Sequence, residues 1–184
     1  MIVDEVQTGF GRTGKLMGHY HEDVKPDLLV LGKALSAGVL PVSAVIGKRE
    51  IMSLIGFGEH GGTFGGNSLA MAVSKRAVEL LLEEGLIENS ERLGKAMKER
   101  LEQIDSPLIK EVRGRGLWCA LEMHEGNDTY ALNRCCIEAG LLPKPTKKSI
   151  MRFAPALNIT ENNMHEGIDR FEKALRTFEK NNKA

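Results

Sequence analysis

Lys33 stands at the junction between an apolar run, residues 26–32, and the small-residue segment ALSAG. We expect partial shielding from water at this junction, which favours the neutral, nucleophilic amine. The small neighbours leave room for a flat ligand to lie against the backbone. These features suit a lysine that forms a Schiff base, although a lysine that merely ends a strand in solvent is the commoner occurrence.

An acidic residue, Asp4, ends another apolar run. Residues 1–3 predict a short strand and residues 26–31 predict a buried one, so Asp4 and Lys33 both follow strand ends. Ligands of open parallel sheets bind beyond the carboxyl ends of the strands. In that crevice a carboxylate can pair with the protonated ring nitrogen of pyridoxal phosphate while a lysine binds its aldehyde. For these two residues alone, an ordinary surface ion pair is the simpler interpretation.

A glycine-rich segment, residues 56–66, leads into a predicted helix whose N-cap is Asn67 or Ser68. A glycine-rich turn before a helix N-terminus presents free N–H groups and the positive end of the helix dipole. Together they can bind an anion such as a phosphate. A flexible loop ahead of a helix is the alternative.

A GxGxxG pattern at Gly9, Gly11 and Gly14, with Asp27 downstream, matches the dinucleotide-binding fingerprint taken literally. Its surroundings argue against that function. The segment after the glycines lacks a helical period, and Asp27 precedes its strand instead of ending it. A nicotinamide-dependent oxidoreductase is therefore a weak rival hypothesis.

The segments DEVQTGFGRTG, PDLLVLGKALSAGVLPVSAVIG and GEHGGTFGGN occur in this order and resemble the class III aminotransferases, which have fold type I and use pyridoxal 5'-phosphate. The resemblance extends over nearly the whole chain. It implies that Asp4 partners the pyridinium nitrogen, that Gln7 hydrogen-bonds the phenolic oxygen, and that Lys33 is the catalytic Schiff-base lysine. It also implies a homodimer in which Thr63 contacts the cofactor phosphate of the neighbouring subunit.

The second half of the chain adds Arg152, in the segment IMRFAPAL. By the resemblance it clamps a substrate carboxylate, a task that suits the planar fork of a guanidinium. A surface-paired arginine at a strand end is the alternative. Three segments, KALSAGVLPVSAV, GEHG and GLLPKPT, resemble family members that transfer the terminal amino group of ornithine to 2-oxoglutarate, giving glutamate semialdehyde and glutamate. Members that act on acetylornithine or on another omega-amino substrate stay an alternative.

Strands and helices alternate along the chain, which indicates an α/β protein. By the resemblance, residues 1–85 form the C-terminal part of the large cofactor-binding domain and residues 86–184 form the small C-terminal domain. Helices are expected over 68–85, 87–103 and 129–139. A last helix, N-capped by Thr160, carries one apolar face. Its residues at alternating steps of four and three are Met164, Ile168, Phe171, Leu175 and Phe178.

The composition argues against nucleic-acid and membrane partners and indicates the kind of compartment. Lysine plus arginine equals aspartate plus glutamate at 25 each, so the chain lacks the net charge that draws proteins to nucleic acid. No run is long enough for a membrane span. The cysteines are Cys119, Cys135 and Cys136, an odd number without CxxC spacing, and they indicate a reducing compartment rather than a zinc or redox site. We expect a cytoplasmic protein, and the mitochondrial matrix stays open.

Several polar residues are interpreted as structural. His19, His21 and Glu22 lack a matching second cluster for a metal ion, so we interpret them as surface loop residues and predict no metal site. Arg113 and Arg115, in the segment VRGRG, are interpreted as turn residues because their glycine neighbours indicate tight backbone geometry.

The start of the sequence lies unusually close to the end of its first strand. We therefore expect a partial chain that lacks an N-terminal half. Family members carry upstream the loop that holds the phosphate within one subunit and the aromatic ring that stacks on the pyridine. Without them, the chain alone is expected to bind the cofactor weakly, and a catalytically silent chain is a further hypothesis.

Overall fold

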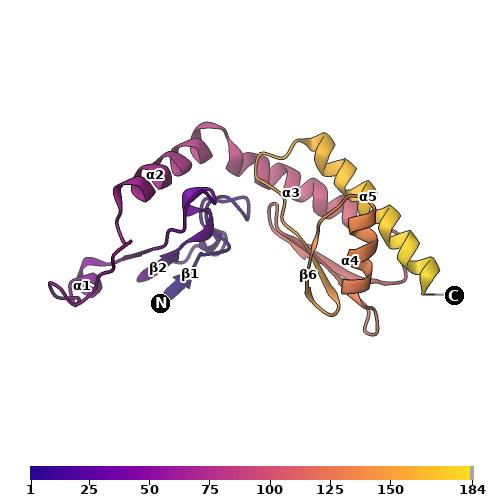
Figure 1. The fold of residues 1–184 in the computed structure, drawn as a ribbon, viewed down its shortest axis with the longest axis horizontal. Helices are drawn as coiled ribbons and strands as arrows, with labels where there is room; N and C mark the ends of the chain where they lie inside the picture. The colour runs from indigo at the N-terminus through magenta and orange to yellow at the C-terminus, as the bar shows by residue number, and fades with distance from the viewer. Residues whose placement is uncertain (183–184) are drawn as a thin grey trace. The chain divides into compact units, whose positions relative to one another are not determined.

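The computed structural model describes residues 1–182, which form two compact units, Met1–Glu88 and residues 89–182 (Figure 1). Each unit contains its own β-sheet. No helix within residues 1–182 combines the length and the apolar character needed to cross a membrane.

The first unit is built on a three-stranded sheet in the order β1-β2-β3. Its strands are β1 (Ile2–Asp4), β2 (Leu28–Leu31) and β3 (Ala44–Gly47). The first two run parallel, with Asp4 opposite Val30, whereas β3 pairs antiparallel with β2. Parallel pairing places the carboxyl ends of β1 and β2 at one edge of the sheet, as the sequence predicts.

Short helical segments connect these strands. The link from β1 to β2 contains the 3-10 helix η1 (Gly18–His21), and the link from β2 to β3 contains the 3-10 helix η2 (Lys33–Ser36). A short helix, α1 (Arg49–Met52), follows β3.

The longest helix of the first unit, α2 (Ser68–Glu83), begins after an N-cap at Asn67. The Asn67 side chain accepts a hydrogen bond of 2.9 Å from the N–H of Ala70, so the predicted cap is confirmed. The helix ends before Gly85, whose φ of 62° is a left-handed conformation that glycine adopts without strain.

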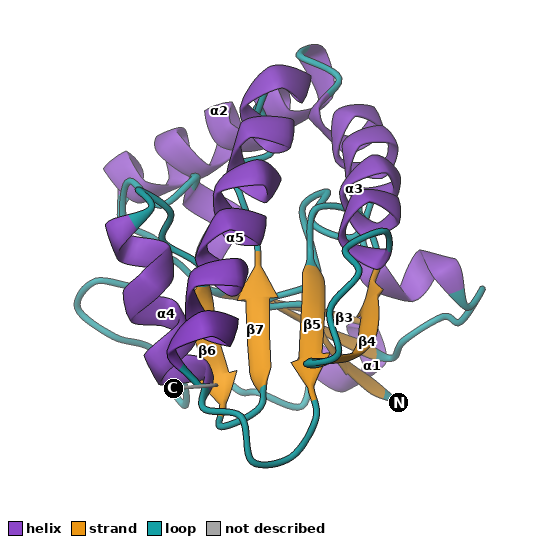
Figure 2. Cartoon of the chain, turned by 90° about the vertical axis from the view of Figure 1, so that its right-hand side faces the viewer, coloured by secondary structure: helices purple, strands orange, loops and turns teal. Residues whose placement is uncertain are grey.

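The second unit contains a four-stranded antiparallel sheet in the order β4-β5-β7-β6. Figure 2 shows α3, α4 and α5 on one side of this sheet. The strands are β4 (Ile109–Gly114), β5 (Cys119–Met123), β6 (Lys144–Lys147) and β7 (Ile150–Phe153), and the helices are α3 (Leu86–Glu102), α4 (Thr129–Glu138) and α5 (Glu161–Asn181).

The core of this unit is formed by the buried residues of its strands, which alternate with a period of two, and by the apolar face of α5, which has the helical period of 3.6. In β5, alternate residues point toward the helices and are buried, beginning with Cys119 and Leu121. In α5, the predicted apolar face is buried in full. Its Phe171 packs edge-to-face on Phe153 of β7, with ring centroids 4.9 Å apart. The N-cap at Thr160 is also confirmed, because its side chain accepts from the N–H of Asn163 at 3.2 Å.

Candidate active site

The candidate site of the first unit lies at the carboxyl ends of β1 and β2. Asp4 is the last residue of β1, and Lys33 follows β2 after a single glycine. The Asp4 side chain is exposed, and its Oδ1 accepts a hydrogen bond of 2.9 Å from the N–H of Val6. The carboxylate is thereby fixed by its own loop and still has oxygen lone pairs that face outward.

The loops that follow β1 and β2 meet at the side chains of Gln7 and Lys33. The Nζ of Lys33 donates a hydrogen bond to Oε1 of Gln7 at 2.8 Å, across 26 residues of sequence. An amine, an amide and a carboxylate thus come from two adjoining strand ends. This set of hydrogen-bond donors and acceptors can bind a carbonyl compound and a ring with polar atoms on its edge.

The backbone at Lys33 is strained, a feature that the sequence did not reveal. Its φ is 43°, in the left-handed region, and Ala37 at the end of η2 has a φ of 53°. Such conformations cost a non-glycine residue of order 1–3 kcal/mol and cluster at functional sites. Lysine therefore occupies this position against a local preference for glycine.

The expected shielding of Lys33 is wrong for the described chain. Its side chain is exposed, and in β2 only Leu31 is fully buried, so the predicted buried strand is half-buried along most of its length. Desolvation of the amine would need a further layer of protein or a ligand.

A buried carboxylate, Glu5, holds the loop that carries Gln7. Glu5 is 1% exposed, and its oxygens accept hydrogen bonds from the backbone N–H groups of Gly18 at 2.9 Å and His19 at 2.7 Å. The hydroxyl of Thr8 also donates to this carboxylate. Glu5 therefore ties the turn after β1 to the start of η1.

His19 completes this cluster, so its interpretation as a surface residue is wrong. Its side chain is 8% exposed, and Nδ1 lies 2.8 Å from Oε1 of Glu5. Burial raises the pKa of the Glu5 carboxyl, but the hydrogen bonds from Thr8, His19 and Gly18 outweigh burial and lower the pKa below its ordinary value. The carboxylate is thus the stable form.

Glu5→Gln should destabilise the protein by about 2 kcal/mol, because the amide leaves buried N–H donors without acceptors. Since the folded-state pKa lies below the ordinary 4.5, the stabilisation by the carboxylate is complete above pH 4.5 and is lost as the pH falls through the lowered value. Urea unfolding at pH 7 and at acidic pH measures both effects. The exposed Glu50→Gln should change stability by less than about 0.5 kcal/mol, and an equal loss in both variants would contradict the role of Glu5.

The GxGxxG segment has a structural explanation. Gly9, Gly11 and Gly14 lie in turns and open no helix. A Cβ at Gly9 would lie 2.9 Å from the carbonyl oxygen of Glu5, and Gly11 and Gly14 have φ values of 82° and 85°. Asp27 precedes β2 and pairs with Lys48 at 2.6 Å, which lowers its pKa to about 2. These residues shape the β1–β2 link, in keeping with the rejection of a dinucleotide site.

Thr63 lies in the exposed glycine-rich loop between α1 and α2. Asn67 closes the loop, since its Nδ2 donates to the carbonyl oxygen of Phe64 at 2.8 Å. Within residues 1–182, no hydrogen bond joins Thr63 to Asp4, Gln7 or Lys33. The loop also exposes two aromatic side chains, Phe57 at 110% and Phe64 at 84%.

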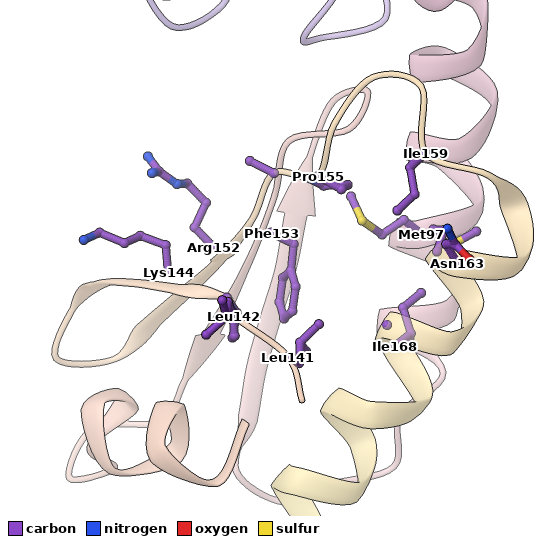
Figure 3. A pocket seen from close by; sticks show the side chains of 14 residues that line it. Met97, Leu141, Leu142, Lys144, Arg152, Phe153, Pro155, Ile159, Asn163 and Ile168 are labelled. Atoms are coloured by element: carbon purple, nitrogen blue, oxygen red, sulfur yellow. The ribbon is translucent and has the colours of Figure 1, made fainter. Parts of the chain in front are cut away.

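Arg152 belongs to the second unit, in the middle of β7. It is half-buried, and its buried Nε has no hydrogen-bond partner among the described residues. Arg152 lines a cavity of about 330 Å³ whose other walls are mostly apolar (Figure 3). A guanidinium N–H that has no acceptor and borders a cavity of this size can bind a small anion.

Known proteins resemble this chain over nearly its full length. The sequence pattern of the family described as Aminotransferase class-III matches residues 1–175. An ornithine aminotransferase of Emericella nidulans is 44% identical over 179 residues, which cover 95% of this chain and 39% of that protein. The chain thus spans less than half the length of this curated relative.

Solved structures agree with the sequence matches. The ornithine aminotransferase of Toxoplasma gondii superposes with a TM-score of 0.94 at 43% identity, covering 98% of this chain and 44% of the other. An acetylornithine aminotransferase of Elizabethkingia anophelis superposes with a TM-score of 0.90 at 45% identity, covering 96% and 47%. These structures share the arrangement of strands and helices described above.

Proposed function

The chain belongs to the class III aminotransferases, pyridoxal-phosphate enzymes of fold type I, and from this premise we propose that it forms part of the active site of an ornithine aminotransferase. The enzyme would transfer the terminal amino group of ornithine to 2-oxoglutarate, with glutamate semialdehyde and glutamate as products. The contact between Lys33 and Gln7 carries the proposal within the chain, because it joins an amine and an amide at the sheet edge where β1 ends with the carboxylate of Asp4.

The residues of the first unit suit pyridoxal phosphate. Lys33 would hold the aldehyde carbon, Asp4 the ring nitrogen and Gln7 the phenolic oxygen. Gly38, five residues after Lys33 in the chain, has open space beside it, since apart from its own chain neighbours no described heavy atom lies within 4 Å of the position that a Cβ would take. When bound, the cofactor supplies an aldehyde for the substrate amine and a ring that withdraws electrons from the substrate carbon.

Each of these side chains has a distinct task. The free Nζ of Lys33 would accept and return the proton at the amino-bearing carbon of the substrate. The amide of Gln7, 2.8 Å from Nζ, orients that amine. The Asp4 carboxylate, held by the N–H of Val6, would keep the ring nitrogen protonated by charge attraction.

The enzyme would be a homodimer whose phosphate site is shared between subunits. In this proposal Thr63 contacts the cofactor phosphate of the neighbouring subunit. The exposed Phe57 and Phe64 on the same loop support an interface there, because large aromatic side chains are seldom left in water together. In the second unit, Arg152 would clamp the substrate carboxylate on the glutamate side, consistent with its unpartnered Nε.

Two features of the proposal concern substrate and location. The acetylornithine aminotransferase of comparable identity makes acetylornithine the second candidate substrate, and the ratio of kcat/KM for the two amines decides between them.

All three cysteines are free, which suits a reducing compartment, the cytoplasm or the mitochondrial matrix. We also propose that residues 1–85 belong to the large cofactor-binding domain and residues 86–184 to the small C-terminal domain.

Reductive labelling tests the proposal directly. Borohydride treatment of the protein at its full natural length, in the presence of pyridoxal phosphate, should add a pyridoxyl mass to the peptide that contains Lys33. The 184-residue chain alone should be labelled weakly, since it spans less than half the length of the relatives that it matches. Label on other lysines only, or a nicotinamide-dependent oxidation of substrate, would contradict the proposal. A protein that is labelled but fails to transaminate ornithine and acetylornithine would be catalytically silent for these amines.

A further inference from the structure

The sheet of the second unit has one face without a helix layer. In β5 and β7 the residues Leu121, Met151 and Phe153 are buried beneath the helices. Strand residues alternate between the two faces, so Arg152 lies on the opposite face, called the open face below. Within the described part of the chain this face is half-buried or exposed.

A row of paired residues crosses the open face and contains three cations. Arg113 pairs with Ala120, Ala120 pairs with Arg152, and Arg152 pairs with Lys144. Directly paired residues of antiparallel strands project to the same face, so Lys144 and Arg152 are immediate neighbours. Like charges in such a position destabilise a sheet unless an anion lies between them.

The two ends of the row differ in whether the cations have carboxylate partners. Arg113, a strand residue and not the turn residue that the sequence suggested, pairs with Glu122 at 2.7 Å and with Glu111 at 3.1 Å. Lys110 also pairs with Glu122 at 2.7 Å. Arg152 and Lys144 have no carboxylate within ion-pair distance among residues 1–182. The fold therefore neutralises one end of the row and leaves two adjacent positive charges at the other.

Both unpaired cations line the same cavity. Figure 3 shows Lys144 and Arg152 extending together on the side away from Phe153. The far walls of this cavity come from the helices α3 and α5. The charged ends of Lys144 and Arg152 extend away from those walls, so an anion held between the two cations would lie on the open face.

We propose that Lys144 and Arg152 together bind one carboxylate of the oxo-acid substrate, and that Lys144 is a specificity-determining residue for dicarboxylates. The inference rests on the proposed function and adds a residue to it. Arg152 can donate two parallel hydrogen bonds to the carboxylate, and Lys144 can donate a third, because a carboxylate has about four acceptor positions. The bound anion also removes the repulsion between the two strands.

The test compares Lys144→Met with Lys110→Met in the protein at its full natural length. Methionine keeps the apolar stem of lysine and removes the charge. Glutarate, a dicarboxylate that cannot be transaminated, serves as the probe in isothermal titration. We expect the Kd for glutarate to rise about tenfold in Lys144→Met and to stay unchanged in Lys110→Met. Lys144→Arg should restore most of the affinity.

Kinetics separate specificity from a structural role. In Lys144→Met, KM for 2-oxoglutarate should rise about tenfold, while KM for ornithine and the rate of the ornithine half-reaction stay unchanged. Native glutarate affinity in Lys144→Met, or equal losses for both substrates, would overturn the inference. Failure of the unsubstituted protein to transaminate ornithine would instead contradict the proposed function, and the glutarate comparison would still test Lys144.

Discussion

Lys33→Ala is expected to reduce the transamination rate by roughly 10³-fold or more, because one side chain would both hold the cofactor and move the proton at the substrate carbon. The measurement is the rate of glutamate formation from ornithine and 2-oxoglutarate by the protein at its full natural length. Circular dichroism should show an unchanged fold, since the Lys33 side chain is exposed and forms one hydrogen bond with another side chain, that of Gln7. A variant that keeps a near-native rate would remove Lys33 from the mechanism.

Two further substitutions separate chemistry from charge. Lys33→Arg keeps the positive charge, but a guanidinium does not give up its proton at neutral pH, so this variant should be as inactive as the alanine variant. Lys15→Ala removes an exposed lysine of the same unit and should leave the rate unchanged. Activity in Lys33→Arg would mean that the position needs only a cation.

The sequence predicted the elements whose signals are local and periodic. The apolar face of α5 and its cap at Thr160 follow from a 3.6-residue repeat and a side chain that accepts a nearby N–H. The parallel ends that carry Asp4 and Lys33 follow from two short apolar runs. The cap and the helix face depend on interactions within a few residues of the chain, whereas β1 and β2 are each recognised locally but pair across 26 residues.

Other features depend on contacts that no local pattern encodes. The Glu5–His19 pair joins residues 14 apart, through turns that lead into η1. The antiparallel strand β3 is too short for its period to stand out. The positive φ of Lys33 contradicts the preference of lysine, so propensity argues against it. Conflicts between local preference and structure are expected at functional sites.

The pairing of Lys144 with Arg152 shows that the register between two strands determines which side chains lie next to each other in a site. The β6–β7 hairpin contains an irregularity between Pro145 and Lys147. An irregularity of this kind shifts which residues oppose each other, and a shift of one residue exchanges the two faces of a strand. The sequence identified Arg152 as a candidate, but its neighbouring cation could be found only from the register.

Gly94→Ala should destabilise the second unit by about 3 kcal/mol or more, because the new Cβ would collide with backbone. On α3, that Cβ would lie 2.1 Å from the carbonyl carbon of Gly116 and 2.2 Å from its oxygen. The next residue is fixed to the same helix, since the N–H of Leu117 donates to Oγ of Ser90 at 3.2 Å. The turn between β4 and β5 therefore cannot move away without breaking that hydrogen bond.

Gly167→Ala is the matched control, with an effect of opposite sign. Gly167 lies within α5, and a Cβ there would be 3.7 Å from Cδ1 of Leu141, an ordinary van der Waals contact. Alanine is favoured over glycine in a helix by about 1 kcal/mol, so helix propensity alone would make both substitutions stabilising. Urea unfolding should instead show a lower midpoint for Gly94→Ala and a higher one for Gly167→Ala. Two higher midpoints would show that α3 does not approach the β4–β5 turn as closely as described, because only that contact opposes the gain in helix propensity at Gly94.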